Sequence, residues 1–258
     1  MSRILFTRMH ARAWLLAALA CLSVHAAAAD ELRIVTEELP PYNMTQNGQV
    51  TGLSTEVVQA VLKEVGMQAP PIQSMPWARA YDIALNAENV MIYSITRTAQ
   101  REKLFKWVGV IAPTRMFLFS RADANLRIKS LDEARKYQIA TVNEDAGEQY
   151  LVSKGFTIGK NLQSSNKYEF NYEKLRLGRV DMWVSNELNA YYLVRQAGDD
   201  PNSVLSHALL LPDISSDGGG LDMAFSLKTP DAVVERFRKA LETIKKNGTY
   251  DSLQKKWL

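Results

Sequence analysis

Two arginines and three hydroxyl residues lie close together in residues 94–101, with the sequence SITRTAQR. An arginine guanidinium can hold a carboxylate through two parallel hydrogen bonds, and hydroxyl groups can add to that contact. The segment joins a predicted strand to a predicted helix over 99–105 that Thr98 would cap. Ligands bind at the carboxyl ends of strands in open α/β sheets, and a helix N-terminus favours anions. These residue types therefore suit an anion site. Taken without further information, however, they favour the simpler interpretation that Arg101 pairs with a surface acid.

Two aromatic residues and one acidic turn are further candidates. Tyr42 follows Pro40 and Pro41, which stiffen its loop, and Trp77 opens a predicted short helix. A flat ring can stack on a ligand side chain or on a cation, and a core position is the alternative for both residues. In the turn NEDAGE, Asp145 either caps the next helix or faces a ligand as an anion.

The first 29 residues predict a secretory signal peptide. Arg3, Arg8 and Arg12 precede an apolar core over 13–24, and residues 26–29 offer an Ala-x-Ala cleavage site. The apolar core is too short to span a bilayer. Cys21 raises the alternative of a lipoprotein, although the residues before it fit a lipobox poorly. We therefore expect export to the periplasm and cleavage near Ala29.

Cleavage at that point leaves a formally neutral chain. Removing the three leader arginines from the 31 basic residues leaves 28, which equals the 28 acidic residues. Composition then gives no support for nucleic-acid binding. The single cysteine lies in the leader. His207 is the only histidine after the leader. The mature chain therefore has neither a thiol nucleophile nor a histidine metal cluster, and we expect no metal and no cofactor.

Short apolar strands alternate with amphipathic helices along the rest of the chain. The alternation predicts an α/β fold with two open, mostly parallel sheets. Strands are predicted over 32–36, 71–75, 90–95, 116–121, 138–142 and 180–185, and after the glycine run at 218–220. Helices are predicted over 54–66, 77–85, 99–105, 130–136, 146–155, 168–178, 187–196 and 229–248, with a last helix to the C-terminus.

Four segments in this order resemble family 3 of the bacterial extracellular solute-binding proteins, the periplasmic receptors of polar amino-acid ABC importers. They are LRIVTEELPPYN, TAQREKLFKW, LGRVDMWVSNE and TIKKNGTYDSLQKKWL. The resemblance implies the two-lobed periplasmic binding protein type II fold, in which two crossing strands form a hinge and the lobes close on a ligand. It places lobe 1 at 30–115 with a return segment at 222–258, and lobe 2 at 116–221. The strands over 116–121 and 222–227 would be the crossings.

The resemblance also implies roles for particular residues. Arg101 matches the family arginine that grips the ligand's carboxylate. Ser94 and Thr96 match positions that hydrogen-bond the ligand. Tyr42 and Trp77 match, or lie next to, positions where the family places an aromatic ring against it.

Three positions depart from the family pattern. Asn186 stands where the family has a carboxylate for the ligand's α-ammonium group, so Asp145 or Glu187 would substitute, or the ligand is not a standard α-amino acid. Asp145 lies in a turn where relatives have a hydroxyl residue or glycine. Arg97 replaces a commonly apolar residue, and it either adds a second cation to the cleft or points to solvent.

We therefore expect a monomeric periplasmic receptor that captures a small polar ligand bearing a carboxylate and delivers it to an inner-membrane ABC permease. The expected binding groups are Arg101, Thr96, Ser94, Tyr42, Trp77, Asn186 and Asp145, and no reaction is catalysed. One alternative is a periplasmic cyclohexadienyl-type dehydratase on the same fold, which would use Asp145 or Glu187 as its acid. Another is a ligand sensor that feeds a signalling partner.

Overall fold

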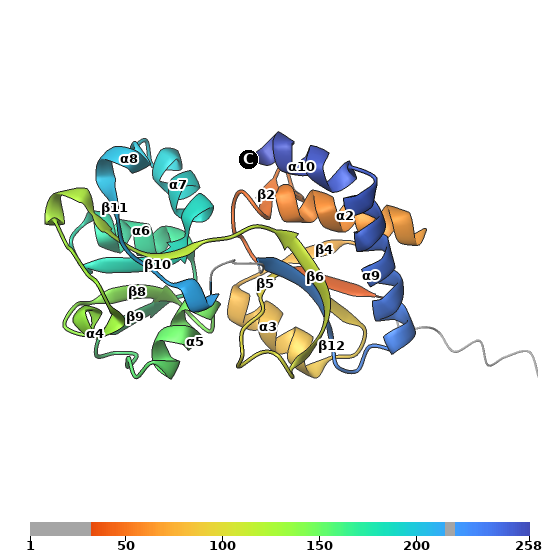
Figure 1. The fold of residues 1–258 in the computed structure, drawn as a ribbon, viewed down its shortest axis with the longest axis horizontal. Coiled ribbons are helices and arrows are strands. Elements are labelled where there is room, and N and C mark those ends of the chain that lie inside the picture. The colour runs from red at the N-terminus through yellow and green to blue at the C-terminus, as the bar shows by residue number, and fades with distance from the viewer. Residues whose placement is uncertain (1–31, 215–219) are drawn as a thin grey trace, which may run out of the picture. The chain divides into compact units, whose positions relative to one another are not determined.

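Two five-stranded sheets organise the residues that the structure, a computed structural model, describes: 32–214 and 220–258 (Figure 1). The expected signal peptide, with Cys21, lies outside the described residues, as does part of the glycine-rich loop. The segment Leu32–Leu258 is one compact unit. A small hairpin of β2 (Met44–Gln46) and β3 (Gln49–Thr51) completes the strands of this part of the chain.

The first sheet has the strand order β4-β1-β5-β12-β6. Its strands are β1 (Arg33–Thr36), β4 (Ile72–Ser74), β5 (Val90–Thr96), β6 (Phe105–Ala112) and β12 (Leu221–Ser226). It is joined by the helices α2 (Leu53–Val65), α3 (Trp77–Asn86), α9 (Asp231–Lys246) and α10 (Thr249–Trp257). We call this sheet and its helices lobe 1. The chain enters it twice, because β12 returns from the second sheet to pair between β5 and β6.

The second sheet has the order β11-β7-β10-β8-β9. Its strands are β7 (Met116–Arg121), β8 (Ile139–Val142), β9 (Leu162–Ser165), β10 (Met182–Asn186) and β11 (Leu205–Leu210). Its helices are α4 (Leu131–Ala134), α5 (Ala146–Ser153), α6 (Tyr168–Arg176), α7 (Glu187–Gln196) and α8 (Pro201–Val204), with 3-10 turns η1 (Ala122–Ala124) and η2 (Pro212–Ile214). We call this group lobe 2. Each sheet has parallel pairings on one side and antiparallel pairings on the other.

Apolar periodicity explains the longest helix. In α9 the buried residues recur every three or four positions, which places them on one face: Val234, Phe237, Ala240, Leu241 and Ile244. The helix begins at Asp231 after Pro230, two residues later than the sequence predicts, and no side chain caps it. Within residues 32–214 and 220–258, no helix is long and apolar enough to cross a membrane.

The one crossing between the lobes that lies wholly within the described residues is shorter than expected. It is formed by residues 113–115, between β6 and β7. The strands predicted to form the two crossings are instead β7 and β12, each hydrogen-bonded on both sides within its own sheet. Every residue of β12 is buried, as befits a central strand.

The helix predicted over 99–105 is wrong. Residues 99–104 form turns closed by backbone bonds from Arg101 N to Thr98 O (3.0 Å) and from Leu104 N to Arg101 O (2.9 Å). Phe105 then enters β6, which pairs with β12. Tertiary pairing of the apolar residues that follow overrides the local helical pattern, so no helix N-terminus contributes to an anion site here.

Candidate ligand-binding site between the lobes

Arg101 is held inside the protein by two aromatic rings of lobe 1. Its side chain is 1% exposed, and its guanidinium carbon lies 5.1 Å from the ring centre of Trp77 and 4.8 Å from that of Tyr81. The two rings are four residues apart in α3, so they share one helix face. Burial lowers the pKa of Arg101, although an arginine stays charged in proteins. The rings attract the cation and leave its N–H edges for acceptors.

Three hydrogen bonds fix the orientation of the Arg101 guanidinium. Nη1 donates to the carbonyl of Thr96 (3.3 Å) in its own lobe. Nε donates to Oε1 of Gln149 (2.9 Å) and Nη2 to the carbonyl of Glu144 (3.0 Å), both in lobe 2. A guanidinium has five N–H groups, so these bonds leave two for a ligand.

The turn around Glu144 connects lobe 2 to the arginine and its stacking partner. The Glu144 carbonyl also accepts from Nε1 of Trp77 at 2.7 Å. Glu144 has φ of 61°, a left-handed conformation that L-residues with side chains adopt at some cost. Strain of this kind persists where surrounding contacts hold it, and here Arg101 and Trp77 of lobe 1 and Glu148 of lobe 2 all bond to the main chain of Glu144.

A cavity between the lobes, which we call the central cleft, lies next to these groups. It has a volume of about 20 Å³, which is room for a water molecule but not for an amino acid. A ligand can therefore enter only when the lobes separate. Its lining comes from both lobes: Glu37, Leu39, Trp77, Ser94, Thr96, Arg101 and Leu221 from lobe 1, and Met116, Asp145, Ala146, Tyr168 and Asn186 from lobe 2.

Ser94 presents an unsatisfied hydroxyl to the central cleft. The residue is 3% exposed, and its Oγ finds no hydrogen-bond partner among the described residues. Its φ of 59° coincides with a shift in the pairing of β5 with β12, where Tyr93 and Ile95 are paired and Ser94 is passed over. A buried unpaired hydroxyl costs about 1–3 kcal/mol, so the strand irregularity and the orphaned group both indicate a ligand contact.

Two buried carboxyl groups meet at the hydroxyl of Tyr168. That oxygen lies 3.4 Å from Oε1 of Glu37 in lobe 1 and 3.3 Å from Oδ2 of Asp145 in lobe 2. All three residues are at most 5% exposed. Burial raises the pKa of Asp145 to about 7, and burial together with the charge of Asp145 raises the pKa of Glu37 well above its usual range.

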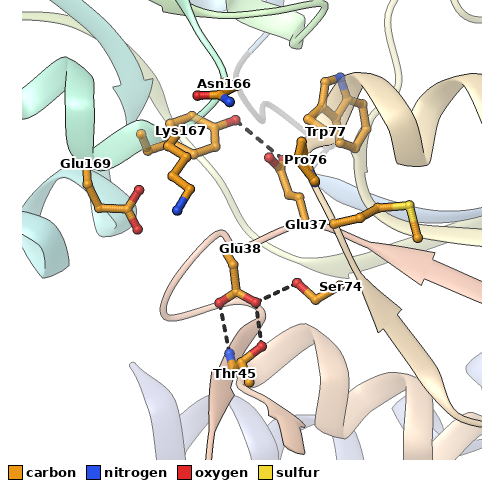
Figure 2. A pocket seen from close by; sticks show the side chains of 11 residues that line it. Glu37, Glu38, Thr45, Ser74, Pro76, Trp77, Asn166, Lys167 and Glu169 are labelled. Atoms are coloured by element: carbon orange, nitrogen blue, oxygen red, sulfur yellow. Dashed lines mark hydrogen bonds between the residues drawn. The ribbon is translucent and has the colours of Figure 1, made fainter. Parts of the chain in front are cut away.

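A second cavity, which we call the outer pocket, shares Glu37, Trp77 and Tyr168 with the central cleft (Figure 2). It has a volume of about 180 Å³. Its other lining residues are Glu38, Thr45, Ser74, Met75 and Pro76 from lobe 1, and Asn166, Lys167 and Glu169 at the start of α6. Oε1 of Glu38 accepts from the hydroxyls of Thr45 and Ser74, both at 2.5 Å. Three acids and one lysine give this pocket a net negative charge.

Six of the seven residues expected to bind ligand line the central cleft: Arg101, Thr96, Ser94, Trp77, Asn186 and Asp145. The amide of Asn186 donates to Oγ1 of Thr114 in the crossing segment. Asp145 caps α5 by accepting from Glu148 N (2.6 Å) and also lines the cleft, whereas its contact with a ligand as an anion stays a prediction.

Tyr42 lies apart from this group. It is fully buried, and its hydroxyl donates to the carbonyl of Pro113 at 3.0 Å, in the crossing between the lobes. The aromatic surface of the cleft comes from Trp77 and Tyr168 instead. Tyr42 is therefore placed to brace the crossing, and its contact with a ligand stays a prediction.

Arg97 and Glu187, whose roles the sequence left open, also lie outside the cleft lining. Arg97 forms a two-pronged ion pair with Glu102 (2.6 and 2.7 Å), and both side chains are 47% exposed. Glu187 pairs with Arg115, and its Oε1 lies 3.0 Å from Nε2 of His207. Arg97 is therefore a solvent-facing cation, and Glu187 is not placed to replace the carboxylate that Asn186 lacks.

Sequence reasoning missed Glu37, Tyr168 and the Glu144–Gln149 contacts. Glu37 directly follows β1, at a carboxyl strand end, so the rule that located residues 94–101 also applied to it. Tyr168 opens α6, and its position in the cleft depends on how lobe 2 folds. The Glu144 contact is a main-chain carbonyl, for which the side-chain type gives no signal.

A two-lobed fold with a charged cleft between the lobes defines a periplasmic binding protein, and the two-lobed α/β fold predicted from the sequence is confirmed by comparison with known proteins. The family model for "Bacterial extracellular solute-binding proteins, family 3" matches residues 32–258. The chain therefore belongs to this family of binding proteins, which are receptors of the amino-acid type.

Two of the similar proteins are named for arginine binding. The chain is 21% identical to the arginine-binding extracellular protein ArtP of Bacillus subtilis (strain 168), over 84% of this chain and 81% of ArtP. It is 23% identical to the arginine-binding periplasmic protein of Mannheimia haemolytica, over 90% and 92% of the two chains.

Two solved structures show the same fold. An ancestral arginine-binding protein bound to arginine has a TM-score of 0.73 and 22% identity, over 88% of this chain and 97% of that one. A histidine kinase sensor domain with similarity to periplasmic binding proteins has a TM-score of 0.74 and 19% identity, over 88% and 96%.

Proposed function

We propose that the protein is a periplasmic receptor that binds an amino-acid-type ligand by its carboxylate and presents it to an inner-membrane ABC permease, acting as a monomer without catalysis. Export and periplasmic location rest on the leader pattern, and the permease partner rests on the family. The observation that carries the proposal is Arg101, a buried guanidinium with two uncommitted N–H groups that faces a cleft which is closed in this structure.

Binding follows from the geometry in two stages. In the open receptor the ligand carboxylate meets Arg101, whose orientation the rings of Trp77 and Tyr81 already fix, and the Ser94 hydroxyl donates to it. Closure about the crossings then brings lobe 2, with Gln149 and the Glu144 carbonyl, towards Arg101 around the ligand, and the cleft is then larger than the volume of about 20 Å³ in this structure. Exclusion of water strengthens these charged hydrogen bonds.

The ligand's ammonium group is assigned to Asp145. Asn186 offers no negative charge, whereas Asp145 is the acidic residue that lobe 2 contributes to the central cleft. This assignment retains a standard α-amino acid as the ligand and moves the α-ammonium contact to the turn before α5.

Calorimetric titration of the protein with L-arginine and agmatine tests the carboxylate contact. Agmatine is arginine without its carboxylate, and arginine is the ligand in the names of two of the relatives described above. We expect L-arginine to bind and agmatine to bind at least about tenfold more weakly. Arg101→Lys keeps the charge but loses the two-pronged geometry, and it should weaken L-arginine by a similar factor. Equal affinity for the two ligands, or an unaffected Arg101→Lys variant, would contradict the proposal.

A cyclohexadienyl-type dehydratase is the second candidate, because a buried carboxyl with a pKa of about 7 beside an arginine is what a general acid requires. Prephenate carries two carboxylates, whereas the central cleft offers one arginine and two acids. This charge balance favours the receptor. Incubation of concentrated protein with prephenate should yield no phenylpyruvate, and enzymatic turnover would establish the dehydratase instead.

A further inference from the structure

Glu37 and Asp145 both lie within hydrogen-bond distance of the Tyr168 hydroxyl, which has too few protons for two carboxylates. One phenol hydroxyl has one proton to donate, yet it lies within hydrogen-bond distance of a carboxyl oxygen from each lobe. If both carboxyl groups were ionised, closure would bring two negative charges together in a site shielded from water, at a high cost. The closed arrangement therefore calls for one added positive charge.

We propose that Glu37, next to the Asp145 that is assigned to the α-ammonium group, provides a site for one further positive charge at the lobe interface, occupied by a cationic side chain of the ligand at neutral pH and by a proton when no such ligand is bound. The inference rests on the proposed function and assigns the ligand class: an α-amino acid with a net positive charge. Glu37 comes from lobe 1 and Asp145 from lobe 2, so the two cationic groups of the bound ligand join the two lobes.

Charges around the pair support a cation. Glu37 faces Asp145, Arg101, Tyr168 and Glu38, and Asp145 also faces Glu148. Once the ligand's carboxylate neutralises Arg101, the two acids of the central cleft match two cationic groups, the α-ammonium and a side-chain cation. An amino acid with a neutral side chain would leave one buried negative charge without a partner.

The outer pocket gives such a side chain room. It continues from the central cleft past Glu37, Trp77 and Tyr168, and Figure 2 shows Glu38 on one side of it and Glu169 on the other. The faces of the two aromatic residues suit an aliphatic stem or a flat guanidinium. The acids beyond them extend the negative field along the same direction.

The pH dependence of binding distinguishes the two occupants of the site, a proton and a cationic side chain. In the closed lobes the pKa of Asp145 is raised to about 7 and that of Glu37 well above its usual range, both by burial, whereas both groups meet water when the lobes open. A raised closed-state pKa means that closure is favoured by protonation and is opposed as pH rises. A neutral ligand must therefore take up a proton on binding, and its affinity should fall by up to about tenfold per pH unit. A cationic ligand supplies the charge itself, so its affinity should be flat between pH 6 and 8.

Titrations with L-arginine and L-citrulline at pH 6 and pH 8 test the site, because citrulline has the same shape with an uncharged urea group. We expect at least about tenfold preference for L-arginine at pH 8, a smaller preference at pH 6, and proton uptake for citrulline alone.

Variants of the two acids test which residues form the site. Glu37→Gln should weaken L-arginine binding about tenfold at pH 8 and remove the pH dependence of citrulline binding. Asp145→Asn keeps the cap acceptor of α5 and should weaken L-arginine and citrulline alike, because both ligands lose the α-ammonium contact. Glu64→Gln, on the exposed face of α2, is the matched control and should change nothing.

Several outcomes would overturn this inference while leaving the proposed function intact. They are equal binding of citrulline and L-arginine at pH 8, identical pH profiles for the two, or wild-type L-arginine affinity in Glu37→Gln. Absence of binding by L-arginine, L-lysine and L-ornithine would overturn the ligand class. Strong binding of agmatine that is still weakened by Glu37→Gln would instead contradict the carboxylate contact and support the cation site. The two proposals can therefore fail separately.

Discussion

At the residue scale, the site consists of groups whose bonding is incomplete in the closed protein. Arg101 has two N–H groups left over, Ser94 has an orphaned hydroxyl, and Glu37 and Asp145 share one phenol proton. Native proteins satisfy nearly all buried polar groups, and Ser94 is the residue with an orphaned buried atom that lines the cleft, whereas others, such as Ser120, lie elsewhere in the described residues.

Replacing Ser94 separates stability from binding. Ser94→Ala removes a buried hydroxyl without a partner, so the free energy of unfolding of the ligand-free protein should rise by about 1 kcal/mol, measured by chemical denaturation. Ligand affinity should fall by roughly tenfold, because the hydroxyl is lost from the bound state.

Ser120→Ala is the matched control for that substitution. The Ser120 hydroxyl is likewise buried without a partner among the described residues, but it lies in β7 and does not line the cleft. It should give a similar gain in stability and leave ligand affinity unchanged. A loss of affinity in Ser120→Ala equal to that in Ser94→Ala would show that Ser94 acts through stability and not through contact.

At the element scale, the cleft is built from strand ends and turns. β1 ends before Glu37, β5 carries Ser94 and Thr96, β8 leads into the turn that holds Asp145, and β10 ends at Asn186. These groups converge because the carboxyl ends of parallel strands meet at one edge of each sheet. The helix α3 adds its first residue, Trp77, which donates to the lobe 2 turn.

Trp77→Phe tests that contact between elements. The substitution keeps a ring beside Arg101 but removes the indole N–H that donates to the Glu144 carbonyl. The closed, ligand-bound form should lose about 1 kcal/mol, so calorimetric affinity should fall about fivefold. Trp107→Phe removes a comparable 3.0 Å bond to the Glu102 carbonyl within lobe 1 and should leave affinity unchanged. Equal affinities in the two variants would show that the Trp77 bond contributes nothing to closure.

Alternation of apolar strands and amphipathic helices was enough to predict the α/β class, whereas Arg101, Thr96 and Asp145 were identified by the rule about strand ends together with the family resemblance. The turn over 99–104 was mistaken for a helix because local periodicity could not show that Phe105 pairs with β12, far away in sequence. Ser94 was identified by resemblance, but its orphaned hydroxyl depends on a strand irregularity that only the fold reveals. The pairing of Glu37 with Asp145 joins two lobes, so no local pattern predicts it.

At the scale of the whole molecule, the account requires the lobes to open and close. The central cleft of this structure has room for a water molecule only, and Arg101 and Trp77 contact lobe 2 across it. This arrangement is a closed form, and the account makes its stability depend on the charge between Glu37 and Asp145.

Acidification should compact the ligand-free protein. Because the raised pKa values of Asp145 and Glu37 favour closure when these groups are protonated, the radius of gyration from X-ray scattering should decrease as pH falls from 8 to 6. Glu37→Gln should be compact at both pH values, since its amide brings no charge to the interface. A wild-type protein with the same radius at both pH values would contradict the linkage between closure and protonation.

The most direct test of the central claim is X-ray scattering at pH 8 with and without saturating L-arginine. The claim is that the lobes close on a ligand whose carboxylate Arg101 holds. The account predicts that L-arginine decreases the radius of gyration of the wild-type protein, that agmatine does not, and that Arg101→Lys shows no decrease at the same concentration. Identical scattering of the wild-type protein with and without L-arginine, or equal compaction by agmatine, would contradict it.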